Sequence, residues 1–160
     1  MQKETQEEKK GKEILTFRLL NEELGLDISC VREVLRPQEI HALPRAPDFI
    51  DGVINLRGHI IAVIDLRKKF NIKAVEDSPK TRIIICKIKK FIVGIVVDSV
   101  NEVISLSKQD IHATPEIVSI QIEDGYISGI ARVGERVITL LDLEKVLTKE
   151  KMDKLSELKK

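Results

Sequence analysis

The chain has 160 residues, of which 27 are basic and 26 acidic, so its formal net charge is +1. This balance excludes a global field that would draw the protein to nucleic acid or to an anionic membrane. Aromatic residues make up only 3% of the chain and Trp is absent, which argues against stacking on single-stranded nucleic acid. Apolar runs such as Phe91 to Val97 are too short to span a bilayer, and the charged N-terminus shows no secretory signal. We therefore expect a cytoplasmic protein with no direct membrane insertion.

The first part of the chain predicts short strands joined by turns. Residues 1–12 hold almost no large apolar side chain and predict a disordered tail. Ile14 to Leu20 and Leu24 to Ile28 predict a hairpin. The apolar positions between Ile28 and Leu35 recur at three- and four-residue steps, which predicts a short helical turn. Three prolines in residues 36–47 then predict an extended loop.

The remaining elements follow the same order a second time. A hairpin is predicted from Gly52 to Ile64, with its tight turn at the Arg57-Gly58 step. After a polar segment at residues 71–80, the predicted elements are strands at Arg82–Ile88 and Phe91–Val97, a helical turn at Asp98–Ile104 and a hairpin at Ile127–Leu141. Beyond Asp142, apolar residues at helical spacing predict an amphipathic C-terminal helix that includes residues 148–160.

Two pairs of segments repeat one another, which indicates an internal duplication. The segment Ile50 to Phe70 recurs without a gap as Ile127 to Leu147, and Ile14 to Leu35 recurs as Ile83 to Ile104. A duplication of this kind predicts two similar half-domains that share a seam. We expect a single domain at residues 13–147 made of two half-barrels, at about 13–75 and 81–147, and leave open an exchange of end segments between them. Short strands with Gly-bearing turns favour small closed barrels.

The sequence offers no constellation for catalysis. The three histidines, His41, His59 and His112, are scattered without metal-ligand spacing, and no nucleophile or phosphate-binding motif is present. Asp65 and Asp142 occupy equivalent repeat positions between an apolar strand and a helical segment, which predicts helix N-caps worth about 1 kcal/mol each. Cys30 and Cys86 lack CxxC spacing and are expected to be free thiols. We therefore predict no enzyme activity, no metal and no cofactor.

One polar pair stands out because the two copies differ there. Arg57 lies in the sequence NLRG at a hairpin turn, and its counterpart in the second copy is Gly134. Both copies keep the equivalent carboxylates Glu33 and Glu102, each between two valines. We expect Glu33 to pair with Arg57 if the hairpin folds back over it. The pair would then define a binding surface, although an exposed turn arginine with no role is an equal alternative.

Several motifs together resemble one known family. The segment FIDGVINLRGHIIAVIDLRKKF (residues 49–70) resembles the signature of CheW-like chemotaxis coupling proteins. The blocks LTFRLLNEELGLDISCVREVL (residues 15–35) and VGIVVDSVNEVISL (residues 93–106) and the closing hairpin are also similar to the family. The resemblance covers roughly Glu13 to Leu147 and is closest to stand-alone members. The family commonly has a proline where this chain has Ala62, a difference that affects the rigidity of the strand.

The resemblance implies a mainly β fold of two pseudo-repeated five-stranded SH3-like barrels packed side by side, with short helices. It implies a non-enzymatic adaptor that couples the cytoplasmic tips of methyl-accepting chemoreceptors to the regulatory domain of the histidine kinase CheA, with no nucleic acid partner. One surface would be a groove between the barrels that receives the receptor tip. The residues that the family pattern marks as candidates for coupling are Ile28, Val31, Glu33, Arg57, Gly94, Val100 and Val103. For the valines and Ile28, an ordinary core position is an equally good interpretation.

Two other classes of function stay open at the level of sequence. Small barrels often bind oligonucleotides, and the seam between two barrels can hold a small molecule. The near-neutral charge and the few aromatic residues argue against the first alternative.

Overall fold

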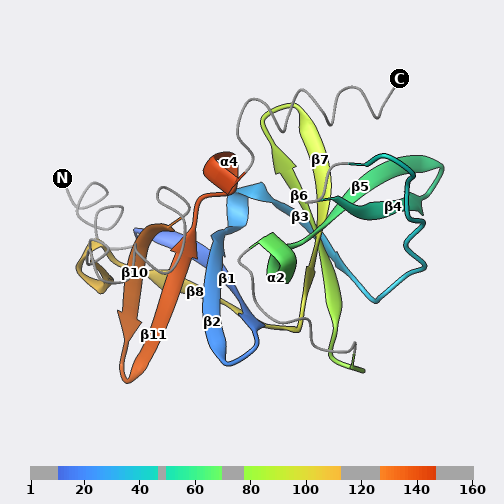
Figure 1. Ribbon diagram of the computed structural model, residues 1–160. Helices are drawn as coiled ribbons and strands as arrows, with labels where there is room; N and C mark the ends of the chain where they lie inside the picture. Colours follow the sequence, from blue (N-terminus) through green and yellow to red (C-terminus); the bar gives the residue numbers. More distant parts are fainter. Residues whose placement is uncertain (1–10, 47–49, 70–77, 113–126, 147–160) are drawn as a thin grey trace.

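The computed structural model describes residues 11–46, 50–69, 78–112 and 127–146, which form two β-sheets side by side with a few short helices (Figure 1). This mainly β architecture was predicted. The strands are β1 (Lys12–Leu19), β2 (Glu22–Asp27), β3 (Val31–Leu35), β4 (Ile50–Leu56), β5 (His59–Asp65), β6 (Arg82–Ile88), β7 (Phe91–Val97), β8 (Ser99–Leu106), β9 (Ile111–His112), β10 (Ile127–Val133) and β11 (Arg136–Leu141). The helices are η1 (Ile28–Cys30), α2 (Leu66–Lys69), η2 (Lys108–Asp110) and α4 (Leu143–Val146).

Each sheet combines strands from both repeat copies. Sheet A has the order β8-β1-β2-β11-β10-β9, and sheet B has the order β3-β6-β7-β5-β4. Sheet B has the five strands expected, and sheet A adds the two-residue β9. The parallel pairs β2 with β11 and β7 with β5 each join the first hairpin of one copy to the last hairpin of the other. The copies therefore exchange hairpins, which ties the two barrels together through the backbone.

The predicted hairpins are confirmed. β6 and β7 occupy the predicted ranges, and β10 and β11 lie within the predicted Ile127–Leu141 segment. In the β4–β5 hairpin Leu56 pairs with His59 across a two-residue turn, where Arg57 has φ 51° and Gly58 has φ 86°. Positive φ at both turn residues is the geometry that matches the twist of the flanking strands.

The two predicted helical turns are largely wrong. Only Ile28–Cys30 forms a helical turn, and residues 31–35 and 99–106 are the strands β3 and β8. In both strands a register shift interrupts the pairing, between Val31 and Glu33 in β3 and opposite Leu15 and Phe17 in β8. A bulge of this kind adds one residue to the two-residue period, so the apolar spacing resembles that of a helix.

The ends of the chain are described only in part. β1 begins at Lys12, one residue inside the predicted tail, and α4 is the described start of the predicted C-terminal helix. Residues 1–10 of the predicted tail and residues 147–160 of the predicted helix lie outside the described residues.

Among the described residues, buried apolar side chains form three clusters, and the largest lies between the sheets. This inter-barrel cluster takes Leu15 and Phe17 from β1, and Phe91, Val93 and Ile95 from β7. Smaller clusters fill each barrel, one in sheet B and one in sheet A. Successive side chains of β7 point to opposite faces, one toward the inter-barrel cluster and the other into its own barrel. Both faces of this central strand are therefore buried, which explains its almost unbroken apolar sequence.

Candidate functional site

Glu33 and Arg57 form the predicted ion pair, at the rim of the sheet B barrel. Arg57 Nη2 donates to Glu33 Oε2 at 2.5 Å, and Arg57 Nη1 donates to Oε1 at 3.2 Å. The Arg57 hydrogen bond lowers the pKa of Glu33, and Glu33 in turn raises the pKa of Arg57. Glu33 belongs to β3 and Arg57 to the turn after β4, and these strands are the two edges of sheet B. The bidentate contact therefore spans the two edges of the sheet.

The backbone at Arg57 is unusual for a residue with a side chain. Its φ of 51° lies in the left-handed region that favours glycine, and the equivalent residue of the second copy is Gly134, with φ 61°. Both copies thus build the same turn, but only the first places a side chain at this position. The Arg57 side chain, with its contact to Glu33, is therefore a feature that the first copy adds to a shared turn.

A largely apolar groove of about 720 Å³ lies beside this ion pair. Its lining comes from β3 to β7 and includes Glu33, Arg57, Leu56, Ile60 and Ile92. Ile60 is 61% exposed, so a large apolar side chain stands open to solvent next to a fixed charge pair. This combination is typical of a surface that another protein covers.

The second copy carries an arginine cluster that the sequence analysis missed. Arg136 Nη1 donates to Glu102 Oε1 at 2.8 Å, and Arg136 Nη2 donates to Glu23 Oε2 at 2.7 Å. Asn101 donates to the same Glu23 oxygen. Glu102 therefore has an arginine partner, as its counterpart Glu33 does. Arg136 lies two residues after Gly134, the position equivalent to Arg57. The recurrence of Glu33 as Glu102 was the feature of the sequence that could have indicated an arginine partner in the second copy as well.

The Arg136 cluster predicts a dependence of stability on pH. The Arg136 hydrogen bond, opposed by partial burial, lowers the pKa of Glu23 below its ordinary 4.5. A carboxyl group whose pKa is lower in the folded than in the unfolded protein stabilises the fold at pH values above its pKa in the unfolded protein. This contribution is lost as the pH falls through its pKa in the folded protein. We expect Arg136→Gln to lower the urea midpoint at about pH 7 and to have little effect at about pH 3. An effect of equal size at both pH values would contradict this origin.

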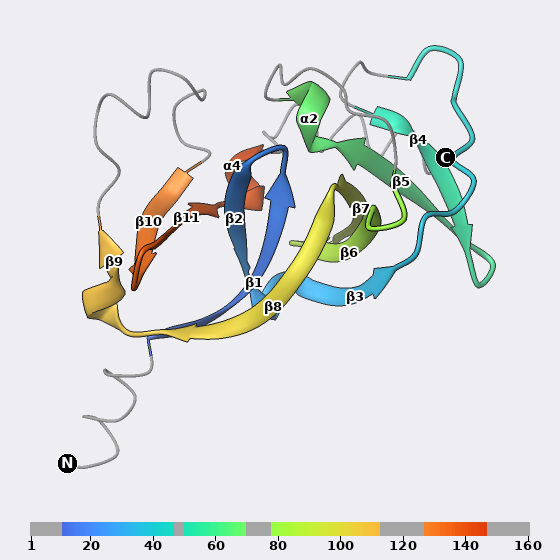
Figure 2. The same cartoon turned by 90° about the horizontal axis from the view of Figure 1, so that it is seen from below.

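Three of the predicted coupling residues pack against the same apolar cluster. Ile28, Val31 and Val100 are half-buried, and all three pack against the inter-barrel cluster. Val103 lies further along β8 and is 49% exposed, and its repeat counterpart Val34 on β3 is 40% exposed. In Figure 2, β8 and β3 run along the same side of the molecule. We call the exposed side of these two strands, with Val34 and Val103, the β3–β8 surface. Glu33 precedes Val34 on β3 and points to the other face of the strand, toward the groove beside Arg57.

Gly94 is a packing residue. It is buried in β7, and a Cβ built on it would lie 3.0 Å from Ile83 Cγ2 and 3.5 Å from Val63 Cγ2. Its repeat counterpart Gly25 is more crowded, with Ile14 Cγ2 at 2.4 Å. Glycine at these positions allows neighbouring strands to pack closely, as was expected for Gly94. Gly94 is therefore buried among side chains of the sheet B barrel and presents no side chain to a partner.

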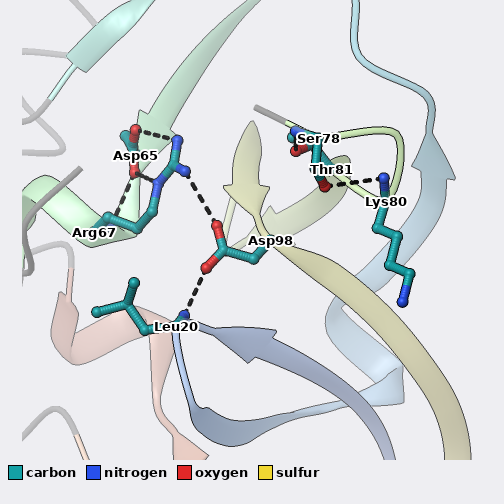
Figure 3. Close-up of polar contacts among 7 residues, drawn as sticks. All are labelled: Leu20, Asp65, Arg67, Ser78, Lys80, Thr81 and Asp98. Atoms are coloured by element: carbon teal, nitrogen blue, oxygen red, sulfur yellow. Dashed lines mark hydrogen bonds and ion pairs between the residues drawn. The ribbon is translucent and has the colours of Figure 1, made fainter. Parts of the chain in front are cut away.

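The predicted N-caps are confirmed, and one of them belongs to a buried ion network (Figure 3). Asp65 Oδ1 accepts the Arg67 N–H at 3.0 Å, and Asp142 Oδ1 accepts the Glu144 N–H at 3.0 Å. The Arg67 side chain, which is 5% exposed, donates to both oxygens of Asp65 and also to Asp98. The sequence showed nothing that would bring Arg67 and Asp98 together.

Among the described residues, no group of three or more His, Cys, Asp or Glu side chains is placed to hold a metal. Cys30 and Cys86 are free, as predicted, and burial raises the pKa of both thiols. Of the helices in the described ranges, none combines the length and hydropathy that crossing a membrane requires.

Comparison with known proteins assigns the chain to a family. The family model for the CheW-like domain matches residues 13–151. The chain is 41% identical over 142 residues to the chemotaxis protein CheW of Klebsiella aerogenes, covering 89% of this chain and 85% of that protein. It is 34% identical over 146 residues to CheW of Bacillus subtilis, covering 91% and 93%.

A solved structure supports the same assignment. The scaffolding protein TtCheW from Thermoanaerobacter tengcongensis superposes with a TM-score of 0.80 at 38% identity, covering 88% of this chain and 94% of that one. Nothing in these comparisons supports an oligonucleotide- or small-molecule-binding module. The chain therefore belongs to the CheW-like family of chemotaxis coupling proteins, which are adaptors and not enzymes.

Proposed function

We propose that this protein couples the cytoplasmic tips of chemoreceptors to the regulatory domain of the histidine kinase CheA, in the cytoplasm where those partners meet. The observations that carry this proposal are the exposed valines of the β3–β8 surface and the bidentate Arg57–Glu33 pair at the rim of the sheet B barrel. Apolar side chains supply the contact area, and the ion pair supplies direction and specificity. An adaptor needs such surfaces and no catalytic group.

The two exposed valines of the β3–β8 surface suit a helical partner. A receptor tip is a helical hairpin, and helices dock their apolar side chains into apolar grooves. Val34 and Val103 are equivalent residues of the two copies, so the surface offers two similar apolar contacts on neighbouring barrels. A site of this size would bind weakly alone, and repetition of the adaptor in an array would provide avidity.

The groove beside Arg57 offers a second apolar region for the second partner. Ile60 stands on its rim, on the strand β5. Two regions on different strands allow the receptor and the kinase to be bound together, which coupling requires.

The direct test is binding of the purified protein to a receptor cytoplasmic fragment and, separately, to the CheA regulatory domain. We expect both to bind, and both to be retained together in a ternary complex. Absence of binding to either partner, for a protein that is folded by circular dichroism, would overturn the proposal.

A substitution at Val103 tests which surface receives the receptor. Because Val103 is 49% exposed, Val103→Glu should leave the fold intact and weaken receptor binding by about tenfold or more, since it places a charge in an apolar contact. The matched control is Val137→Glu, at a 58% exposed valine on β11, outside the β3–β8 surface. Equal loss with both variants would mean that the effect is one of surface charge and not of this site.

A further inference from the structure

Within the described residues, the chain passes between the two sheets at two places. It leaves sheet A after β2 and enters sheet B at β3 through η1, and it leaves sheet B after β7 and enters sheet A at β8 through Asp98. Each crossing leads directly into one of the two strands of the β3–β8 surface. The geometry of the crossings therefore decides how β3 and β8 are placed relative to each other.

The second crossing is held by contacts from both sheets (Figure 3). From the sheet B side, Arg67 Nη1 donates to Asp98 Oδ1 at 3.1 Å. From the sheet A side, the Leu20 N–H in the β1–β2 turn donates to Asp98 Oδ2 at 2.5 Å. The backbone N–H of Asp98 also donates to the Arg18 carbonyl at 2.9 Å. One carboxylate thus joins α2 of one barrel to a turn of the other.

The first crossing lacks this arrangement, although the repeat makes the two crossings equivalent. The residue equivalent to Asp98 is Ser29, and the residue equivalent to Arg67 is Glu144. At η1 the Ser29 N–H instead donates to Asp27 Oδ1 at 3.0 Å, a contact within three residues of the chain. The long-range ion pair is therefore present at only one of the two crossings that the repeat makes equivalent.

Stability alone gives a poor reason for burying these charges. The desolvation of a buried ion pair offsets most of its attraction, and apolar residues of the same volume often stabilise a fold as well. The inter-barrel cluster already provides the apolar contact between the sheets. Apolar contact has no preferred direction, however, whereas a hydrogen-bonded ion pair is satisfied in one geometry. The pair can therefore select one arrangement of the barrels among those that the apolar cluster tolerates.

We propose that Arg67 and Asp98 act as positioning residues that set the direction in which β8 leaves the crossing, and so the spacing of β3 and β8 on the partner-binding side. The expected effect on binding rests on the proposed function, because the spacing of β3 and β8 matters only if a partner contacts both strands. Neither residue belongs to the β3–β8 surface. Their effect on binding would be transmitted through the orientation of the barrels.

The test uses Asp98→Ala, with Ser29→Ala as the matched control at the equivalent crossing. Arg67 keeps its two contacts with Asp65 in Asp98→Ala, at 3.0 Å each, so its charge stays compensated and the protein should fold. Residual dipolar couplings of the protein alone would compare the orientation of sheet A with that of sheet B. We expect a changed relative orientation in Asp98→Ala and none in Ser29→Ala. Asp98→Asn, which removes the charge and retains an acceptor, should give a smaller change in the same direction and serves if the alanine variant does not fold.

Binding to the receptor fragment completes the test. We expect affinity to fall by about tenfold in Asp98→Ala, with Ser29→Ala unchanged. A wild-type orientation in both Asp98 variants would overturn the positioning role, and so would a changed orientation with undiminished binding. If the wild-type protein bound neither partner, the proposed function would fail, but the orientation measurement would still decide whether the pair positions the barrels.

Discussion

Arg57→Gly is expected to abolish most of the coupling activity while leaving the fold as stable as before. The substitution removes the guanidinium that is bound to Glu33, and it places glycine at a backbone φ of 51°, which glycine adopts readily. The second copy already builds the equivalent turn with Gly134. We expect the thermal midpoint to stay within about 3 °C of wild type and kinase activation in a reconstituted receptor–kinase assay to fall by at least about tenfold.

The control for Arg57→Gly is Lys89→Gly. Lys89 also has a left-handed backbone, with φ 54°, and is exposed in the β6–β7 turn, so the control removes a cation and relieves the backbone in the same way. We expect coupling to be unaffected in this variant. A substantially lower midpoint in Arg57→Gly would show that Arg57 is a structural residue. Intact coupling in this variant would show that Arg57 is no part of the binding surface.

Phe17→Ala should cause the largest loss of stability, about 3–5 kcal/mol in the free energy of unfolding. Phe17 is fully buried in the inter-barrel cluster, where its ring contributes to the contact between the two sheets. Its removal leaves a cavity that the exchanged hairpins cannot close easily. Urea denaturation followed by circular dichroism measures the loss, and a single transition for both barrels is expected because they share this cluster.

Val137→Ala provides the matched comparison for Phe17→Ala. Val137 is 58% exposed on β11, and its truncation should change the free energy of unfolding by less than about 0.5 kcal/mol. Two separate transitions in Phe17→Ala would show that each barrel folds on its own core, contrary to the role assigned to the inter-barrel cluster.

Local patterns predicted the elements whose contacts are close in sequence. The β6–β7 hairpin follows from two short apolar runs separated by two lysines, and the Arg57-Gly58 turn follows from a glycine at a tight turn. The caps at Asp65 and Asp142 follow from a carboxylate at the start of a helical segment. The Glu33–Arg57 pair was anticipated because the repeat exposed one place where the copies differ.

Sequence patterns gave wrong or no predictions where a β-bulge changed the apolar spacing or where two residues distant in the sequence came into contact. The bulges in β3 and β8 shifted the two-residue period and gave apolar spacings typical of a helix. Arg136 contacts Glu23 from a distant part of the chain, and Arg67 reaches Asp98 because each follows one of two neighbouring strands, β5 and β7, that come from different copies. No spacing rule links such residues, because their contact depends on which strands of which copy become neighbours.

By itself, the sequence determined that the protein is a duplicated β-barrel adaptor, through its repeats, its turns and its family motifs. Only the tertiary structure decided how the copies exchange hairpins, and hence that β3 and β8 flank one inter-barrel cluster. The physical reason is that the local sequence pattern specifies only that a strand pairs and buries its apolar side chains. Pairing within one copy and pairing between the two copies satisfy that pattern equally well. The choice is made by the packing of the whole domain, in which Asp98, bound by Arg67 on one side and by the Leu20 N–H on the other, joins the two sheets.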